Sequence, residues 1–234
     1  MYSFFSKVRY SELDADHKMK LGSIINYFQD CSTFQSEELN LGIDTLEGRH
    51  RAWLLNSWQV EVTRFPEVGE KIEVGTFPYA FKAFYGYRNF WMKDEAGLYL
   101  AKADSIWFYL NTETGKPVKA PKEEITGYNL EPRLEMDYTG RKIELPEKME
   151  EGEAITVRSH HLDTNLHVNN AQYVFLAGDW LPEGFRPKRL RMEYKKAARM
   201  GDVMIPRVGK VEDGYVVALT DKEGAVFAAA EFKE

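Results

Sequence analysis

Cysteine is almost absent from this chain of 234 residues, which contains only Cys31. A single thiol excludes an intramolecular disulfide and a multi-cysteine metal site, and it is typical of a reducing compartment. Long apolar runs are also missing, and no stretch approaches the roughly 20 apolar residues of a membrane span. The first ten residues have neither a secretory-signal pattern nor that of an organellar presequence. We therefore expect a cytoplasmic protein without a membrane partner, although an organellar protein lacking its presequence would have the same pattern.

An excess of positive charge is missing as well. The 31 Lys and Arg residues against 37 Asp and Glu residues give a net charge of −6. Nucleic-acid binding needs a broad positive field, so we expect no nucleic-acid partner. No Gly-x-Ser-x-Gly elbow, phosphate-binding loop or dinucleotide fingerprint occurs, so we expect no cofactor. What the chain does have is 44% apolar and 14% aromatic residues, which is typical of a folded protein with room for a large apolar pocket.

The first half has the pattern of one buried helix followed by an antiparallel sheet. Apolar residues recur at helical spacing between Leu21 and Leu39. From Trp53 the period changes to two, as expected of half-buried strands. Other strands are predicted at about 3–10, 71–77, 81–92 and 98–110. A helix this apolar is stable only if the sheet wraps around it, which predicts an α+β fold.

The second half repeats the first. Leu13-Asp-Ala-Asp-His-Lys18 is matched by Leu162-Asp-Thr-Asn-Leu-His167, and the separation is 163 − 14 = 149. Val60-Glu-Val-Thr-Arg64 and Gly69 are matched by Met192-Glu-Tyr-Lys-Lys196 and Gly201, with a separation of 201 − 69 = 132. Two matched anchors in the same order predict an internal duplication.

A polar stretch lies between the two copies. Residues 118–152 contain three prolines and end in the charged run Glu147-Lys-Met-Glu-Glu-Gly-Glu153. We interpret this stretch as a connection rather than as folded core. The predicted organisation is a first domain over 1–125, a linker over 126–150 and a second domain over 151–234.

Three of the five histidines gather in the second copy. His160, His161 and His167 accompany Asp163 and Asn165, just before the apolar stretch 171–180. A helix amino terminus presents free N–H groups that can stabilise an oxyanion. An imidazole can accept a proton from water, and a carboxylate or amide can hold the ring, the water or the substrate. These residue types together favour acyl hydrolysis.

Two other interpretations compete for these residues. Asp163 and Asn165 could be ordinary turn and capping residues. The first copy keeps the acidic turn but has Lys18 where the second has His167, so capping explains the shared aspartate and not the histidine. A metal site on the three histidines is conceivable, but no second ligand cluster accompanies them, and we expect no metal.

At these segments the sequence resembles the acyl-acyl-carrier-protein (acyl-ACP) thioesterases of plant plastids and bacteria. Four segments carry the resemblance: Leu162-Asp-Thr-Asn-Leu-His-Val-Asn-Asn170, Met192-Glu-Tyr-Lys-Lys196, Arg51-Ala-Trp-Leu-Leu55 and Ser105-Ile-Trp-Phe-Tyr-Leu-Asn111. The resemblance implies a tandem double hotdog, with two antiparallel sheets each wrapped around a long helix. It also implies hydrolysis of fatty acyl thioesters, with the acyl chain accommodated in the aromatic first domain and catalysis in the second.

The resemblance assigns catalysis to Asp163, Asn165 and His167. The sequence departs from the plant family at Ala197 and Ala198, where the plant enzymes have glutamate and cysteine. We therefore expect water to attack the thioester directly. Cys31 is interpreted as a small core residue and Glu193 as a structural one, since its counterpart Glu61 lies in the copy without the histidine.

A basic stretch suggests how a partner is recognised. Residues 186–199 hold seven Lys and Arg residues against the single acid Glu193. On a strand, Arg189, Arg191 and Lys195 would share the outer face, either as a solvated surface or as a dock for acidic acyl carrier protein (ACP). Acyl-coenzyme A as substrate and a non-catalytic acyl-binding module stay open as alternatives. A homodimer is possible.

Overall fold

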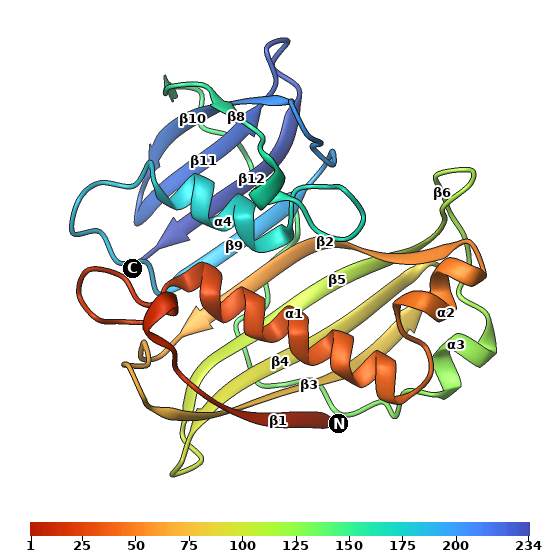
Figure 1. Ribbon diagram of the computed structural model, residues 1–234. Coiled ribbons are helices and arrows are strands. Elements are labelled where there is room, and N and C mark those ends of the chain that lie inside the picture. The colour runs from red at the N-terminus through yellow and green to blue at the C-terminus, as the bar shows by residue number, and fades with distance from the viewer. The chain divides into compact units, whose positions relative to one another are not determined.

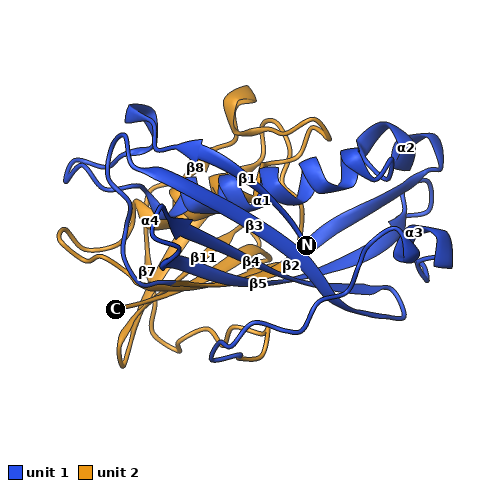
Figure 2. Cartoon of the chain, turned by 90° about the horizontal axis from the view of Figure 1, so that it is seen from below, with its two compact units in different colours: residues 1–56, 62–138 blue, residues 57–61, 139–234 orange.

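The computed structural model describes all residues from 1 to 234 and divides them into two compact units. Unit 1 comprises residues 1–56 and 62–138, and unit 2 comprises residues 57–61 and 139–234 (Figure 2). None of the helices has the length and apolarity needed to cross a membrane.

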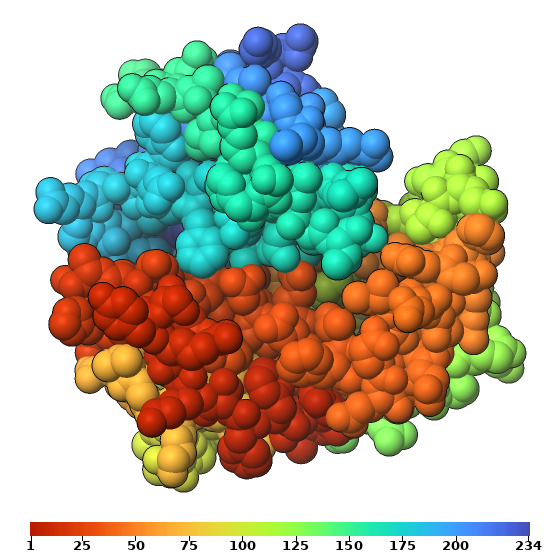
Figure 3. Space-filling view, viewed as in Figure 1, coloured from red at the N-terminus to blue at the C-terminus, as the bar shows by residue number.

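Unit 1 is an antiparallel sheet that carries one long helix. Its strands lie in the order β1-β3-β4-β5-β2, and α1 packs on β1 and β3 (Figure 1). In the space-filling view β1, α1 and α2, coloured red to orange, form a continuous surface over this unit (Figure 3). The bounds are β1 Tyr2–Lys7, α1 Leu21–Glu38, α2 Ile43–Gly48, β2 Arg51–Val62, β3 Lys71–Lys82, β4 Tyr85–Asp94, β5 Tyr99–Asn111, β6 Lys116–Pro117 and α3 Lys122–Thr126, with a 3₁₀ turn η1 at Tyr10–Glu12.

Aromatic and aliphatic side chains fill the space between α1 and its sheet. Ile24 and Phe28 of α1 are fully buried, and the Phe28 ring lies 5.4 Å from that of Phe90 on β4. Cys31 is also fully buried, its Sγ lies 3.5 Å from the carbonyl oxygen of Val74, and burial raises the pKa of the thiol to about 12. The interpretation of Cys31 as a core residue is confirmed, because a thiol with this pKa is protonated near neutral pH.

Strand β3 is longer than the sequence pattern predicts. It runs to Lys82 rather than ending near residue 77, and Pro78 lies inside it. Pairing of β3 with β1 stops at Thr76, so Pro78 lies beyond the paired part of that edge, where its carbonyl accepts a 3.2 Å hydrogen bond from the Glu131 N–H. Proline has no N–H group, so at such an edge no ladder hydrogen bond is lost. The pairing of β3 with β4 also shifts its register between Pro78 and Ala80.

Unit 2 repeats the arrangement with a helix of nine residues, half the length of α1. Residues 57–61 of β2 pair with β9, and the order continues β9-β12-β11-β10-β7, all antiparallel. Helix α4 lies against β11 and β12. The bounds are β7 Glu150–Glu151, β8 Ile155–Thr156, α4 Asn170–Gly178, β9 Arg189–Tyr194, β10 Val203–Val211, β11 Gly214–Thr220 and β12 Val226–Lys233, with a 3₁₀ turn η2 at Ser159–His161. The predicted α+β fold is confirmed.

The polar stretch 118–152 differs from the expectation that it lies outside the folded core. In unit 1 the Tyr138 hydroxyl donates to Asn89 Oδ1 over 3.1 Å, and Tyr128 is buried. In unit 2 Ile143 is 2% exposed and belongs to a core cluster with Val216 and Ala229. A few apolar residues therefore anchor a segment whose overall composition is that of a loop.

A buried carboxyl group in unit 1 gives a pH prediction. Asp104 is 9% exposed and accepts a 2.9 Å hydrogen bond from the Tyr79 hydroxyl. Burial raises the pKa of Asp104 to about 6, against the opposing effect of this hydrogen bond and of Arg133. Because the folded-state pKa lies above the ordinary value of about 3.9, the stability contributed by this group is fully present below pH 4 and is lost as pH rises to 6.

Asp104→Asn is therefore expected to change the free energy of unfolding more favourably at pH 7.5 than at pH 4, by about 2 kcal/mol. The asparagine carbonyl still accepts from Tyr79, while the cost of burying a charge disappears. Urea unfolding of both proteins at the two pH values measures the difference. Equal effects of the substitution at both pH values would contradict a raised Asp104 pKa.

Candidate active site

Asp163 folds the turn that carries the predicted catalytic residues. Its Oδ1 accepts hydrogen bonds from the backbone N–H groups of Asn165, over 2.8 Å, and His167, over 3.3 Å. The Asp163 N–H donates to the His167 carbonyl over 2.8 Å, which closes the turn. Leu166 has a φ of 57°, in the left-handed region that a side chain rarely adopts. The three predicted residues are therefore brought together on one tight turn.

Unit 1 contains the same turn with different side chains. Asp14 Oδ1 accepts from the N–H groups of Asp16, over 2.9 Å, and Lys18, over 3.0 Å. The Asp14 N–H donates to the Lys18 carbonyl over 2.8 Å, and His17 has a φ of 62°. The aspartate is thus a backbone requirement of both turns, whereas the asparagine and the histidine are particular to the second.

Neighbouring segments hold the second turn in place. His167 forms an isolated antiparallel bridge with Arg199, and the Val168 N–H donates to the Ala198 carbonyl over 2.9 Å. His167 and Asp163 are half-buried, whereas Asn165 is exposed. The turn then leads directly into α4, whose position agrees with the predicted helix at 171–180.

The side chain of Asn169 caps the amino terminus of α4. Asn169 Oδ1 accepts from the Ala171 N–H over 2.9 Å. The hydroxyl of Tyr194 donates to the Asn170 carbonyl over 2.9 Å, and burial raises the pKa of Tyr194 well above its ordinary value. A protonated, buried hydroxyl from β9 therefore ties the helix start to the sheet of unit 2.

The two alanines that replace the plant glutamate and cysteine lie beside this turn. Ala197 is exposed, and Ala198 is fully buried. The Ala198 N–H donates to the Tyr173 hydroxyl over 2.9 Å, and burial raises the pKa of Tyr173 to about 12. The side chains at 197 and 198 offer no group that could act as acid or nucleophile.

The histidines do not form a metal centre. The rings of His160 and His161 meet edge to face with centroids 4.1 Å apart. No group of three His, Cys, Asp or Glu side chains in the chain is arranged to hold a metal ion. The alternative of a metal site on His160, His161 and His167 therefore has no support in the geometry.

The basic residues of β9 are only partly available. Arg191 donates to Glu231 Oε2 over 2.9 Å and to the carbonyl oxygens of Gly140 and Lys142, so it fastens the stretch between the copies to the sheet. Lys195 lies just after β9, with its ammonium 3.4 Å from Glu193. Arg189 is exposed. The three side chains therefore do not form one uniform outer face.

Glu193 has a structural contact, as predicted. Its Oε2 accepts a hydrogen bond from the Ile143 N–H over 3.1 Å and lies in an ion pair with Lys195. Because Ile143 is one of the buried anchors of the connecting stretch, Glu193 holds that stretch rather than facing the turn at Asp163. Sequence comparison of the two copies predicted a structural residue, and the structure adds the contact with Ile143.

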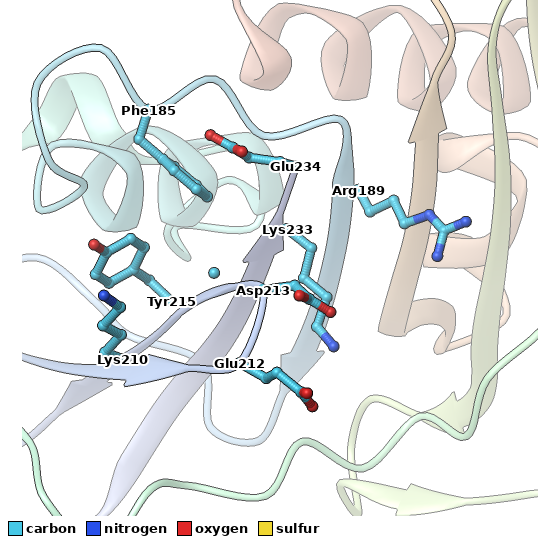
Figure 4. Close-up of a pocket in the computed structure, with 9 residues that line it drawn as sticks. Phe185, Arg189, Lys210, Glu212, Asp213, Tyr215, Lys233 and Glu234 are labelled. Atoms are coloured by element: carbon cyan, nitrogen blue, oxygen red, sulfur yellow. The ribbon is translucent and has the colours of Figure 1, made fainter.

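A pocket of about 420 Å³ in unit 2 lies beside Arg189 (Figure 4). Phe185 and Tyr215 form an edge-to-face pair in it, with ring centroids 5.1 Å apart. Its cations Arg189, Lys210 and Lys233 are accompanied by the acids Glu212, Asp213 and Glu234. This mixture of charges does not favour an anionic ligand, and none of Asp163, Asn165 and His167 lines the pocket.

Comparison with known proteins covers almost the whole chain. The family of the acyl-ACP thioesterase N-terminal domain matches residues 2–128, and that of the C-terminal domain matches residues 144–232. A chloroplast acyl-[acyl-carrier-protein] hydrolase of Cuphea viscosissima is 28% identical over 200 residues, covering 80% of this chain and 47% of that protein. The chain thus spans about half the length of the curated relatives it matches.

Solved structures agree with this match. An acyl-ACP thioesterase from Bacteroides thetaiotaomicron has a TM-score of 0.90 at 22% identity, covering 99% of this chain and 96% of that one. The 12:0-ACP thioesterase from Umbellularia californica has a TM-score of 0.86 at 19% identity, covering 99% and 96%. The predicted double hotdog fold is confirmed, and the chain belongs to the acyl-acyl-carrier-protein thioesterase family.

Proposed function

We propose that the protein hydrolyses the thioester of a fatty acyl-ACP and releases free fatty acid. The observation that carries the proposal is the contrast between the two turns of one chain. Both have the same backbone hydrogen bonds, but only the second presents Asn165 and His167. Turn formation explains Asp163 and Asp14 equally, so a chemical role is the remaining reason for the amide and the imidazole.

In the proposed mechanism His167 accepts a proton from water as the water oxygen attacks the thioester carbonyl carbon. The Asn165 amide donates a hydrogen bond to the resulting oxyanion. Collapse of the intermediate breaks the C–S bond, and His167 returns the proton to the thiolate. Asp163 acts through the backbone, because its Oδ1 binds the N–H groups that set the positions of both residues.

Direct attack by water agrees with the side chains present. A covalent acyl-enzyme would need a nucleophile, and the position of the plant cysteine is occupied by Ala198. The only thiol, Cys31, is fully buried in unit 1 with a pKa raised to about 12. Thiolates, not thiols, are the effective nucleophiles, so Cys31 is unsuited to this step.

The test is release of free acid from matched panels of acyl-ACP and acyl-coenzyme A with several chain lengths. We expect the acyl-ACP substrates to have the higher kcat/KM. Preference for acyl-coenzyme A would identify the alternative substrate. Binding of acyl-ACP without release of acid would identify a non-catalytic acyl-binding module and overturn the proposal.

Docking of the acidic ACP on Arg189, Arg191 and Lys195 is part of the proposal. Because Arg191 is bound by Glu231 and two carbonyl groups, its replacement would disturb the fold as well as the surface. Arg189→Glu with Lys195→Glu is the cleaner change. We expect a fall of about tenfold in kcat/KM for acyl-ACP at low salt, which 0.5 M salt largely removes. A salt-independent effect, or none, would exclude docking at these residues.

The proposal also includes the division of roles that was predicted from the sequence. Residues 1–125 would hold the acyl chain, residues 126–150 would connect, and residues 151–234 would carry the chemistry. A cytoplasmic location and a homodimer stay predictions.

A further inference from the structure

Two large apolar side chains are exposed at the catalytic turn of unit 2. Leu166 is 70% exposed and Met200 is 59% exposed. His167 and Arg199 form an isolated antiparallel bridge. Leu166 precedes His167 and Met200 follows Arg199, so both lie at the next register position of the same antiparallel pair. The two segments therefore present Leu166 and Met200 side by side, next to the proposed base.

Folding of the turn gives no reason for a leucine at position 166. Its φ of 57° lies in the left-handed region, which costs a leucine free energy and which histidine and asparagine adopt more often. An exposed leucine also gains little from the hydrophobic effect within the chain. Unit 1 has His17 at the same place of its turn, with a φ of 62°. Val68, 132 residues before Met200, is the smaller counterpart of the methionine.

Positive charge lies beside the apolar pair. Arg199 and Arg158 are both exposed. The Val157 N–H donates to the Asp202 carbonyl over 2.8 Å, and the Val157 carbonyl accepts from the Gly201 N–H over 3.1 Å. The segment that carries Arg158 therefore runs next to the one that carries Arg199. We call the four side chains of this surface the turn patch: Leu166, Met200, Arg158 and Arg199.

Unit 1 neutralises the matching positions. Arg9, the counterpart of Arg158, forms a 2.6 Å ion pair with Glu12. In unit 2 the residue matching Glu12 is a histidine, so this carboxylate is missing. Glu67 occupies the place of Arg199 and forms an ion pair with the lysine of that turn. The positive charge of the turn patch is thus particular to the copy with the proposed chemistry.

We propose that the turn patch contacts the acidic ACP where the acyl thioester reaches His167. The assignment rests on the proposed function, because hydrolysis at this turn requires the carrier protein to approach it. Protein interfaces combine an apolar centre with a charged rim, and methionine and arginine are enriched in them. A small anion would use the two arginines and leave the apolar pair in water, so the composition favours a protein as occupant. The contact is additional to the one at Arg189 and Lys195.

Leu166→Asn with Met200→Gln removes the apolar pair. We expect the ratio of kcat/KM for acyl-ACP to kcat/KM for the same acyl group on free phosphopantetheine to fall about tenfold. Thermal stability should not fall, because asparagine tolerates the left-handed region better than leucine does. His17→Asn with Val68→Gln makes the matched change in unit 1 and should leave the ratio within about twofold of the wild type. An unchanged ratio in the first variant would overturn the assignment.

Arg199→Glu installs the residue that unit 1 has at this place. The turn tolerates it there, because the Glu67 N–H donates to the Glu70 carboxylate over 3.0 Å, as the Arg199 N–H donates to Asp202 over 2.8 Å. We expect the same ratio of kcat/KM values to fall about tenfold at low salt and to recover largely in 0.5 M salt. A loss that salt does not reduce, or no loss, would contradict docking on the turn patch.

Binding of holo-ACP, which carries the phosphopantetheine arm without an acyl chain, gives a measurement that does not depend on turnover. Calorimetric titration of the full chain should give a Kd about tenfold higher for Leu166→Asn with Met200→Gln than for the wild type. This increase in a protein that hydrolyses no thioester would refute the proposed function and leave the docking surface standing. Hydrolysis of acyl-ACP with an unchanged Kd and an unchanged ratio in the variants would do the reverse.

Discussion

His167→Lys is expected to lower kcat for acyl-ACP by about 10²- to 10⁴-fold, the range for loss of a general base. Lysine occupies the matched position of unit 1, where the turn forms with the same backbone hydrogen bonds. The variant should therefore fold normally while its ammonium group, protonated at pH 7.5, cannot accept a proton from water. Steady-state hydrolysis and thermal unfolding of the full chain measure the two effects separately.

Lys18→His is the matched control. It places the imidazole on the turn of unit 1, where Lys18 makes an exposed ion pair with Glu67. Exposed pairs contribute little, so stability should change by less than about 1 kcal/mol. We expect its kcat to stay within about twofold of the wild type. Near-normal turnover by His167→Lys would show that the histidine is not the base.

Arg49→Met is expected to lower the free energy of unfolding by about 3 kcal/mol, because it leaves a buried carboxylate without its cation. Glu124, on α3, is 1% exposed, and Arg49 follows α2 and forms an ion pair with it. The second carboxylate oxygen of Glu124 has no hydrogen-bond partner. The ion pair is therefore the main compensation for burying this charge within unit 1. Urea denaturation measures the loss.

The double variant Arg49→Met with Glu124→Met separates burial of charge from loss of packing. A buried ion pair replaced by apolar side chains is often neutral in stability, so we expect the double variant to recover most of the loss. If the double variant were as unstable as Arg49→Met alone, the effect would arise from the lost contacts of the arginine stem instead.

The sequence was sufficient for the elements whose apolar pattern is strong and for the duplication. The helix predicted at 21–39 is observed at Leu21–Glu38, since its buried positions recur every three or four residues. Asp163, Asn165 and His167 were predicted as the catalytic set from the contrast with Asp14 and Lys18 of the first copy and from the family resemblance, and their roles stay a prediction. The sequence could not predict that the Asp163 carboxylate accepts hydrogen bonds from backbone N–H groups. Residue type alone does not distinguish such a carboxylate from one that binds a histidine ring.

Two other parts could not be found from periodicity. Arg191 was predicted to lie free on an outer face, but Glu231 and the carbonyls of Gly140 and Lys142 bind it, and these come from segments distant in sequence. Ile143 was assigned to a linker because its neighbours are polar, yet it is buried. A single buried residue produces no repeating apolar pattern from which its burial could be predicted. His161 was noted as a member of a cluster, but the hydrogen bond that its Nδ1 accepts from the Arg158 N–H is seen only in the structure.

The repeated turn has a consequence for how such a chain can change over time. In a symmetric homodimer one gene encodes both subunits, so any substitution appears in both and neither copy can specialise alone. Here the two copies have separate codons. Lys18 can therefore stand in the first copy where the second has His167, because Asp14 supplies the backbone hydrogen bonds that folding of the turn requires. Two copies within one chain are thus free of a genetic constraint that the symmetry of a homodimer imposes.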